Sequence, residues 1–271
     1  MTLVQACIAN KGNSVVLLAD RLLTTHLSED LPPYEFEAKK PKIFFNESVG
    51  IGFAGSSLHA DVAQSKILDK TDFDEISNII TEYLYNKRKD NIDKTIKRLT
   101  GVESDRFFTE CELPIPPEIR GMIYTEMKDY SLNCQSMVTG FDKKKNARII
   151  ITDDYGGMTD TTNFGFFAIG SGSPFSRVYF DQYGYSIDMD TKEAVLFAFE
   201  AKKWAQAHTG VGDNTDIIVF IKDKKEIKVE PIYDNSDLMK RLKDTYTAEI
   251  QKKKDLRDKL IKDLFKDGDG I

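Results

Sequence analysis

The chain has 271 residues and a mildly acidic balance, with 44 acidic against 38 basic side chains. This length can bury a sizeable core as one large domain or two small ones. The sequence has no basic stripe with interleaved aromatic residues, which argues against a nucleic-acid partner. No apolar run is long enough to cross a membrane, and the first residues lack the basic region of a signal peptide, so we expect no membrane partner.

The few cysteines and histidines indicate a reducing compartment. Three cysteines are too few and too far apart for a disulfide framework, and they lack metal-ligand spacing with the three histidines. We therefore expect a cytoplasmic protein with no metal and no cofactor.

The first third of the chain alternates between strand and helix patterns. The strands expected here are residues 3–9, 14–20, 42–45 and 49–54. The first two are separated by the turn-prone residues 10–13 and are expected to pair as a hairpin. From Leu58 to Leu84 the apolar residues recur at helical spacing, which predicts two helices, the first cut short near residues 69–72.

Residues 86–130 have no sustained period and contain three prolines, Pro114, Pro116 and Pro117. They are expected to form an insertion with one short helix near residues 118–128.

Regular patterns return at Leu132. The strands expected in this half are residues 132–141, 146–153, 164–169, 217–221 and 226–230. Residues 190–207 are expected to form a helix, with a core face made of Ala194, Phe197, Ala198, Ala201, Trp204 and Ala205. We expect one domain over residues 2–235 and a charged helical extension over 236–271, whose thin apolar stripe suits docking on a neighbour or a short coiled coil.

This order of elements predicts an α+β fold in which two sheets lie between helical layers, a four-layer αββα sandwich. The order alone does not separate this sandwich from other α+β folds.

Thr2 is a candidate nucleophile because only Met1 precedes it. Methionine aminopeptidases remove Met1 when a small residue follows, which would give Thr2 a free α-amine beside its hydroxyl. An α-amine titrates at about 7.7–8.0, so it can accept the hydroxyl proton directly or through a water molecule. The ordinary alternative is that threonine is simply common at position 2.

Several motifs make the chain resemble the β-type subunits of proteasomes. Residues 168–175 read Ala-Ile-Gly-Ser-Gly-Ser-Pro-Phe and lie between an expected strand and the long helix, and residues 215–220 read Thr-Asp-Ile-Ile-Val-Phe. Together with Val15–Arg21 and Gly50–Gly55, the resemblance covers most of residues 2–89 and 132–230. The chain is identified as a member of the N-terminal nucleophile (Ntn) hydrolase superfamily, in its proteasome-like branch.

The resemblance implies a set of catalytic residues. Thr2 would attack a carbonyl carbon, Asp20 would brace the site, and Lys40 would pair with Asp20 and lower the proton affinity around the nucleophile. Gly55 would stabilise the oxyanion through its backbone N–H, and Ser171 would organise the α-amine and a water molecule.

The resemblance also implies contacts with a peptide or protein substrate. Thr24 would pair with an extended peptide, and Phe53 and Ser57 would line its binding site. The position of the lysine is open to a slip of one residue, because Lys39 precedes Lys40.

The loop after the long helix departs from the family pattern. Active proteasome-like subunits carry Asp-x-x-Ser-Gly-Gly there, whereas alignment backward from Asp216 puts His208 and Val211 at the aspartate and the serine. His208 either replaces the aspartate or is a surface histidine at the end of a helix. The 86–130 insertion has no counterpart in the family pattern, which puts the standard four-ring barrel in doubt.

The resemblance leaves three functions open. The first is an N-terminal-threonine hydrolase that cleaves a peptide or amide bond. The second is an inactive ring or scaffold subunit, although the α-type subunits with that role carry an extra helix before the first strand. The third is a transpeptidase or ligase that passes the acyl group to an amine. We expect a homo-oligomer that associates through surfaces other than those of a closed proteasome ring.

Overall fold

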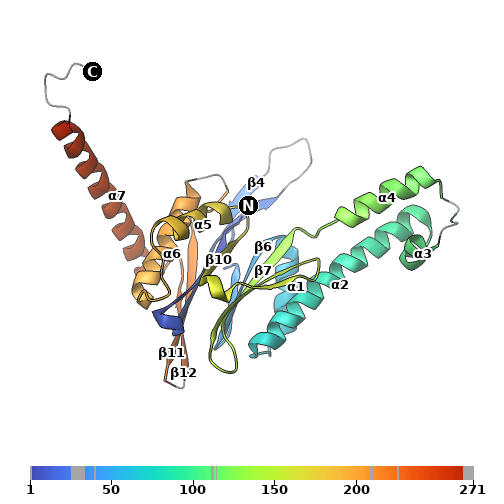
Figure 1. Ribbon diagram of the computed structural model, residues 1–271, viewed down its shortest axis with the longest axis horizontal. Helices are drawn as coiled ribbons and strands as arrows, with labels where there is room; N and C mark the ends of the chain where they lie inside the picture. Colours follow the sequence, from blue (N-terminus) through green and yellow to red (C-terminus); the bar gives the residue numbers. More distant parts are fainter. Residues whose placement is uncertain are drawn as a thin grey trace, which may run out of the picture.

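A computed structural model describes residues 2–25, 34–39, 41–110, 113, 115–207, 210–224 and 226–264. The fold is α+β, and two antiparallel sheets lie face to face between two layers of helices (Figure 1). The expected αββα sandwich is therefore present.

The first sheet has the strand order β10-β1-β2-β11-β12, and all neighbouring strands are antiparallel. Its strands are β1 (Val4–Ala9), β2 (Ser14–Asp20), β10 (Phe166–Ile169), β11 (Thr215–Asp223) and β12 (Glu226–Ile232). The short 3-10 helix η1 (Asn10–Gly12) connects β1 to β2 as the expected hairpin. Every residue of β1 and β2 is buried, which explains why their sequences are almost continuously apolar.

The second sheet has the order β5-β6-β7-β8-β9. Its strands are β5 (Ile43–Phe45), β6 (Val49–Gly55), β7 (Cys134–Phe141), β8 (Ala147–Asp153) and β9 (Met158–Asp160). The 3-10 helix η2 (Thr162–Phe164) then leads back to the first sheet. A separate hairpin, β3 (Leu22–Thr25) with β4 (Tyr34–Glu37), continues directly from the end of β2.

Glycines on the inner face of β6 allow the two sheets to approach closely. A Cβ atom at Gly52 would lie 2.4 Å from Val4 Cγ1, and one at Gly50 would lie 2.8 Å from Leu17 Cδ2. Neither distance leaves room for a side chain, so β6 packs with its backbone against β1 and β2. Because side chains alternate along a strand, Phe53 then points to the opposite, helix-covered face.

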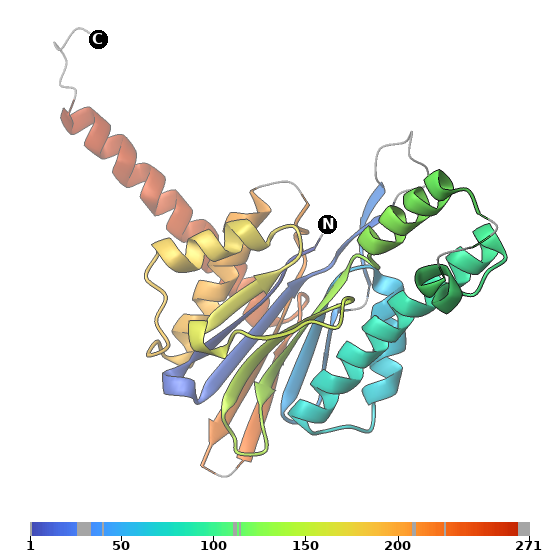
Figure 2. The same ribbon diagram turned by 45° about the vertical axis from the view of Figure 1, so that its right-hand side comes forward.

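Helices cover both outer faces of the sandwich, as Figure 2 shows. The pair α5 (Ser173–Gln182) and α6 (Thr191–Gln206) packs on the first sheet, and the pair α1 (Ser57–Ile67) and α2 (Phe73–Thr100) packs on the second. The Asp190 carboxylate caps α6 by accepting hydrogen bonds from the amides of Lys192 and Glu193.

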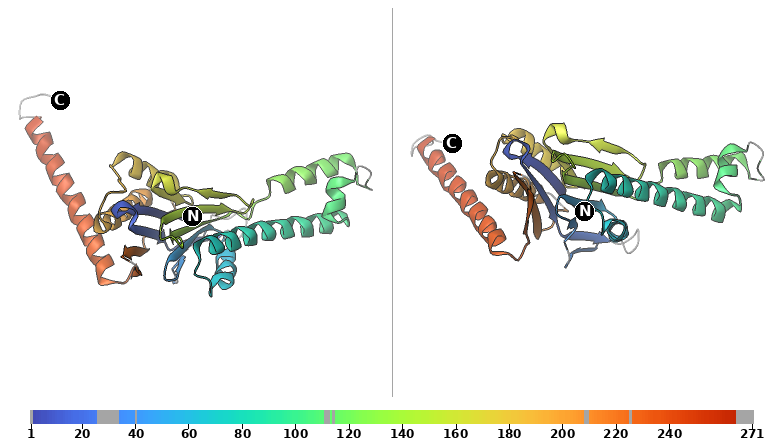
Figure 3. Two further views of the ribbon diagram at one scale, coloured as in Figure 1. Left: turned by 60° about the horizontal axis from the view of Figure 1, so that its bottom comes forward. Right: turned by 90° about the horizontal axis from the view of Figure 1, so that it is seen from below.

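The 86–130 segment is a helical lobe that projects from the sandwich (Figure 3). The end of α2 packs with α3 (Ser104–Thr109) and α4 (Pro117–Asp129) in a small core of their own, centred on Phe107 and Ile96. On the other side of the molecule, α7 (Asp237–Leu264) projects from the sandwich. Only its first turns pack against the body, through Met239, Leu242 and Tyr246.

The structure departs from the sequence-based expectations at several elements. The charged residues 86–98 continue α2 as a single helix of 28 residues, and α4 matches the expected short helix. The elements that were not expected are β3, β4, β9, α3 and α5.

One side of α6 also differs from its expected core face. Trp204 is 39% exposed, whereas Lys202, which was not expected in the core, has no exposed surface. Within the described part of the chain, none of the helices has an apolar stretch sufficient for a membrane crossing.

Candidate active site

The registers of the first sheet bring Thr2, Asp20 and Ser171 together. Val4 pairs with Ala19 of β2 and with Ile169 of β10. Continuing these two registers back along β1 places Leu3 opposite Asp20 and Thr2 opposite Ser171. Hydrogen bonds agree: Leu3 N donates to Asp20 Oδ1 at 2.8 Å, and Thr2 N donates to Ser171 Oγ at 3.1 Å. Sheet pairing therefore fixes residues that lie far apart in the sequence around Thr2.

Lys42 connects the Thr2 hydroxyl to Asp20. It lies immediately before β5 and its side chain is only 9% exposed. Its ammonium donates to Thr2 Oγ1 at 2.8 Å, to Asp20 Oδ1 at 3.2 Å and to the carbonyl oxygen of Leu22. The candidate nucleophile thus receives a hydrogen bond from a buried cation that is itself held by a buried carboxylate.

The Asp20 carboxylate is fully buried and accepts three backbone hydrogen bonds besides the one from Lys42. Oδ1 accepts from Leu3 N, whereas Oδ2 accepts from Leu22 N at 3.1 Å and from Gly212 N at 2.9 Å. These donors come from the residue before β1, from the start of β3 and from the loop after α6. Asp20 therefore joins three separate segments of the chain beside Thr2.

The carboxyl end of β6 lies next to Thr2. A Cβ atom at Gly170 would lie 2.2 Å from the Thr2 carbonyl oxygen and 3.3 Å from Ala54 Cβ, so Ala54 and Thr2 flank the same glycine. Gly55 follows Ala54, is exposed, and has a φ of +102° that disfavours other residues. A Cβ atom there would lie 1.7 Å from the Asn133 carbonyl oxygen. Gly55 thus presents an exposed backbone, with no side chain to cover it, near the candidate nucleophile.

A second carboxylate, Glu37 of β4, holds the loop after α6. Its Oε1 accepts hydrogen bonds from Asp213 N at 2.8 Å and Asn214 N at 3.4 Å. Gly212 leaves no room for a side chain, because a Cβ atom there would lie 2.5 Å from Glu37 Oε1 and 2.7 Å from Leu22 Cβ. The loop is therefore closely packed against the hairpin that borders the site.

Burial shifts the proton affinity of two lysines around Asp20. Desolvation lowers the pKa of Lys42, and the charge and hydrogen bond of Asp20 oppose this shift. Desolvation also lowers the pKa of Lys202, behind the site, to about 7. Both ammonium groups consequently release a proton more readily than an exposed lysine.

The lysine at the site differs from the one expected from the sequence. Lys42 makes the contacts with Thr2 and Asp20 that were assigned to Lys40, and Lys40 lies outside the described residues. The sequence-based assignment weighed only Lys39 and Lys40, whereas the lysine at the site lies two residues beyond Lys40, after Pro41. The useful signal was the position of Lys42 directly before the strand Ile43–Phe45, since the start of a strand fixes a side chain more firmly than a loop does.

The structure places one of the three proposed substrate-binding side chains, and it lies away from Thr2. Phe53 is 4% exposed and packs under α1 and α2, with Phe44 as its aromatic neighbour, so the structure does not bring its side chain to Thr2. Thr24 lies in β3, and Ser57 begins α1; the described part of the chain includes their backbone but not their side chains. His208 lies outside the described residues.

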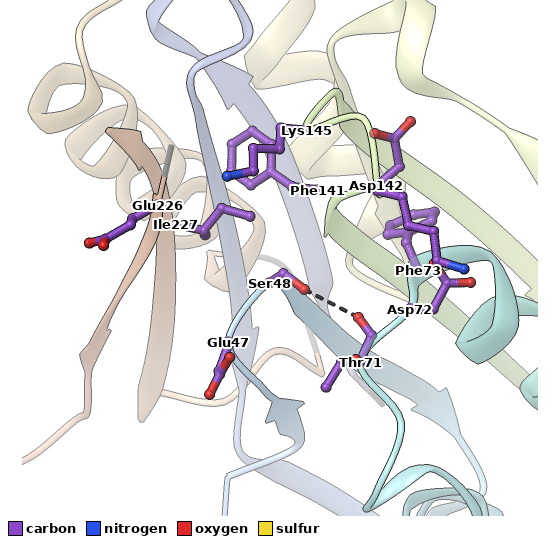
Figure 4. A pocket seen from close by; sticks show the side chains of 11 residues that line it. Glu47, Ser48, Thr71, Asp72, Phe73, Phe141, Asp142, Lys145, Glu226 and Ile227 are labelled. Carbon is purple, nitrogen blue, oxygen red and sulfur yellow. Dashed lines mark hydrogen bonds and ion pairs between the residues drawn. The ribbon is translucent and has the colours of Figure 1, made fainter. Parts of the chain in front are cut away.

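Other polar clusters lie away from Thr2. The pocket in Figure 4, of about 500 Å³, opens beside Ser48 and Phe141, at the opposite end of β6 from Gly55. Asp72 and Asp142 border it together with lysines. Across the described ranges, no three histidine, cysteine or acidic side chains are grouped closely enough to hold a metal ion.

The family model of the proteasome subunit matches residues 98–220. The chain is proteasome-like over this range. The range is less than half of the chain; it includes Ser171, α6 and Gly212, and it begins inside the segment that was expected to have no counterpart in the family. Thr2, Asp20 and Lys42 lie before it. The comparison with curated proteins gave no match.

Proposed function

We propose that this chain is an N-terminal threonine hydrolase of the Ntn type, which cleaves a peptide or amide bond through an acyl-enzyme. The observation that carries the proposal is the Lys42 ammonium between Thr2 Oγ1 and the buried Asp20. With Met1 in place, Thr2 N is an amide; removal of Met1 turns it into an α-amine, held by Ser171.

In the first half of the reaction, Thr2 Oγ1 attacks the substrate carbonyl carbon. Its proton passes to the α-amine, directly or through a water molecule, and Lys42 stabilises the negative charge that develops on Oγ1. The backbone N–H of Gly55 donates to the oxyanion. The C–N bond then breaks as the leaving amine takes the proton from the α-ammonium, and the acyl group remains on Thr2 as an ester.

In the second half, water attacks the ester carbonyl and gives a proton to the α-amine. The bond between the acyl carbon and Oγ1 breaks, Oγ1 regains its proton, and a carboxylic acid leaves. An amine in place of water would form a new amide, which is the transpeptidase alternative.

The proposal includes a substrate-binding strand, a cellular location and an oligomeric state. An extended peptide substrate would lie along β3, which follows Asp20 by two residues and carries Thr24. We propose a cytoplasmic location for the enzyme. We also propose that it forms a homo-oligomer, because the exposed apolar side chains of α7, such as Leu256 and Leu264, are best buried against another copy.

Two variants of the nucleophile test the proposal. Thr2→Ser keeps the hydroxyl and Thr2→Ala removes it, and both small residues permit removal of Met1. With a peptide library as substrate, wild type and Thr2→Ser should release new termini and Thr2→Ala should not. Hydrolysis by Thr2→Ala at the wild-type rate would refute the proposal, and a wild type that is inactive and keeps Met1 would favour the scaffold.

A further inference from the structure

Lys202 is a buried charge that the mechanism above does not use. It lies on the sheet-facing side of α6 and has no exposed surface. Its ammonium donates to Gln206 Oε1 at 3.0 Å and to the carbonyl oxygen of Asp213 at 2.8 Å. Burying an ammonium group carries a desolvation cost of several kcal/mol, which hydrogen bonds to two neutral oxygens offset only in part.

Neither acceptor depends on Lys202 alone. Gln206 Oε1 also accepts from Lys203 Nζ at 2.9 Å, and the Asp213 carbonyl oxygen also accepts from Thr215 Oγ1 at 3.2 Å. Satisfying these two oxygens therefore does not explain why the chain buries an ammonium group here.

The bond to Asp213 leads directly to the candidate active site. The residue before Asp213 is Gly212, whose N–H donates to Asp20 Oδ2 at 2.9 Å. Asp20 in turn holds Lys42, which donates to Thr2 Oγ1. Lys202 thus holds the loop between α6 and β11 at the Asp213 carbonyl, and Asp20 holds it at the preceding amide. Glu37 binds the Asp213 amide, and Lys203 binds the Asp213 carboxylate, from the outer side of the loop.

We propose that Lys202 is a positioning residue of the Thr2 site. By holding the Asp213 carbonyl, it keeps the Gly212 amide on Asp20, and Asp20 keeps Lys42 on the Thr2 hydroxyl. The catalytic importance of Lys202 rests on the proposed hydrolase function, whereas the structural coupling between Lys202 and Gly212 is testable without any activity.

The charges around Lys202 decide its pH response. Burial and the neighbouring Lys203 of α6 lower its pKa to about 7, and Asp20 of β2, Asp213 of the loop and Glu37 of β4 oppose that shift. The unfolded chain, with an ordinary lysine pKa near 10.4, binds more protons than the folded one between these two values. The contribution of Lys202 to stability therefore rises with pH from about 7 upward and is most unfavourable below 7.

Nuclear magnetic resonance of the full chain tests the coupling. At pH 6, Lys202→Met should shift the Gly212 amide signal and speed its hydrogen exchange relative to the wild type, and it should do so in the Thr2→Ala background as well. An unchanged Gly212 signal and exchange rate in Lys202→Met would overturn the proposal whether or not the chain is a hydrolase.

Activity and thermal melting separate positioning from a purely structural role. Lys202→Met should lower kcat about 10- to 100-fold with little change in KM, yet raise the melting temperature at pH 6 by about 2–4 °C or more. That gain should shrink toward pH 8.5. Lys192→Met, at an exposed position of the same helix, is the matched control and should change neither quantity. Wild-type kcat in Lys202→Met, or a lowered melting temperature, would contradict the positioning role.

Discussion

Replacing Lys42 by methionine tests the contact on which the proposed chemistry depends. The change removes the hydrogen bonds to Thr2 Oγ1, Asp20 Oδ1 and the Leu22 carbonyl while keeping an apolar side chain of similar length. Breaking a buried ion pair typically destabilises a protein by about 3–5 kcal/mol. Asp20 keeps three backbone donors, so we expect the lower end of this range, about 3 kcal/mol, and a folded protein.

The same substitution should also slow the reaction of Thr2. Loss of the cation beside Oγ1 should slow the attack about 10³-fold or more, which corresponds to about 4 kcal/mol of activation free energy. The rate at which a peptide epoxyketone modifies Thr2, followed by intact-mass spectrometry, measures this step without a known substrate. Lys39→Met is the matched control, because the Lys39 side chain is exposed. Wild-type labelling of Lys42→Met, or an equal loss in Lys39→Met, would refute the assignment of Lys42.

Two further substitutions and one labelling experiment test other parts of the account. Ser171→Ala removes the partner of Thr2 N and should slow epoxyketone labelling about tenfold; an unchanged rate would show that Ser171 does not organise the amine. Gly55→Ala should lower the melting temperature by several degrees, because its Cβ would meet the Asn133 carbonyl oxygen in a positive-φ conformation; an unchanged melting curve would contradict that geometry. Burial raises the thiol pKa of Cys7 and of Cys134 to about 12, so neither should react with iodoacetamide at pH 8 in the folded protein, and peptide mapping would detect modification that contradicts this.

The sequence predicts the sandwich well where local patterns and packing agree. The strands 14–20 and 49–54 are almost continuously apolar and are buried, and the apolar residues at helical spacing in 190–207 are buried except Trp204. Residues 86–98 were misjudged because their charges mask a helix that is stabilised by α3 and α4, and such tertiary support has no signature within the segment.

The candidate site was predictable only in part, for geometric reasons. Thr2 was a candidate from its position, and Asp20 and Ser171 were expected from the family resemblance; the strand registers of the structure bring the three together. Lys42 was missed because it lies two residues beyond Lys40, directly before β5, and no period in the sequence distinguishes the neighbouring lysines. Lys202 lies at a helix position that charge alone assigns to the surface, and only the surrounding sheet and loop show that it is buried.

The mass of the N-terminal peptide of the purified protein, before and after treatment with a peptide epoxyketone, tests the central claim most directly. The account predicts a peptide that begins with Thr2 and that gains the mass of one inhibitor molecule on Thr2. A peptide that retains Met1 and gains no mass would contradict the proposed nucleophile.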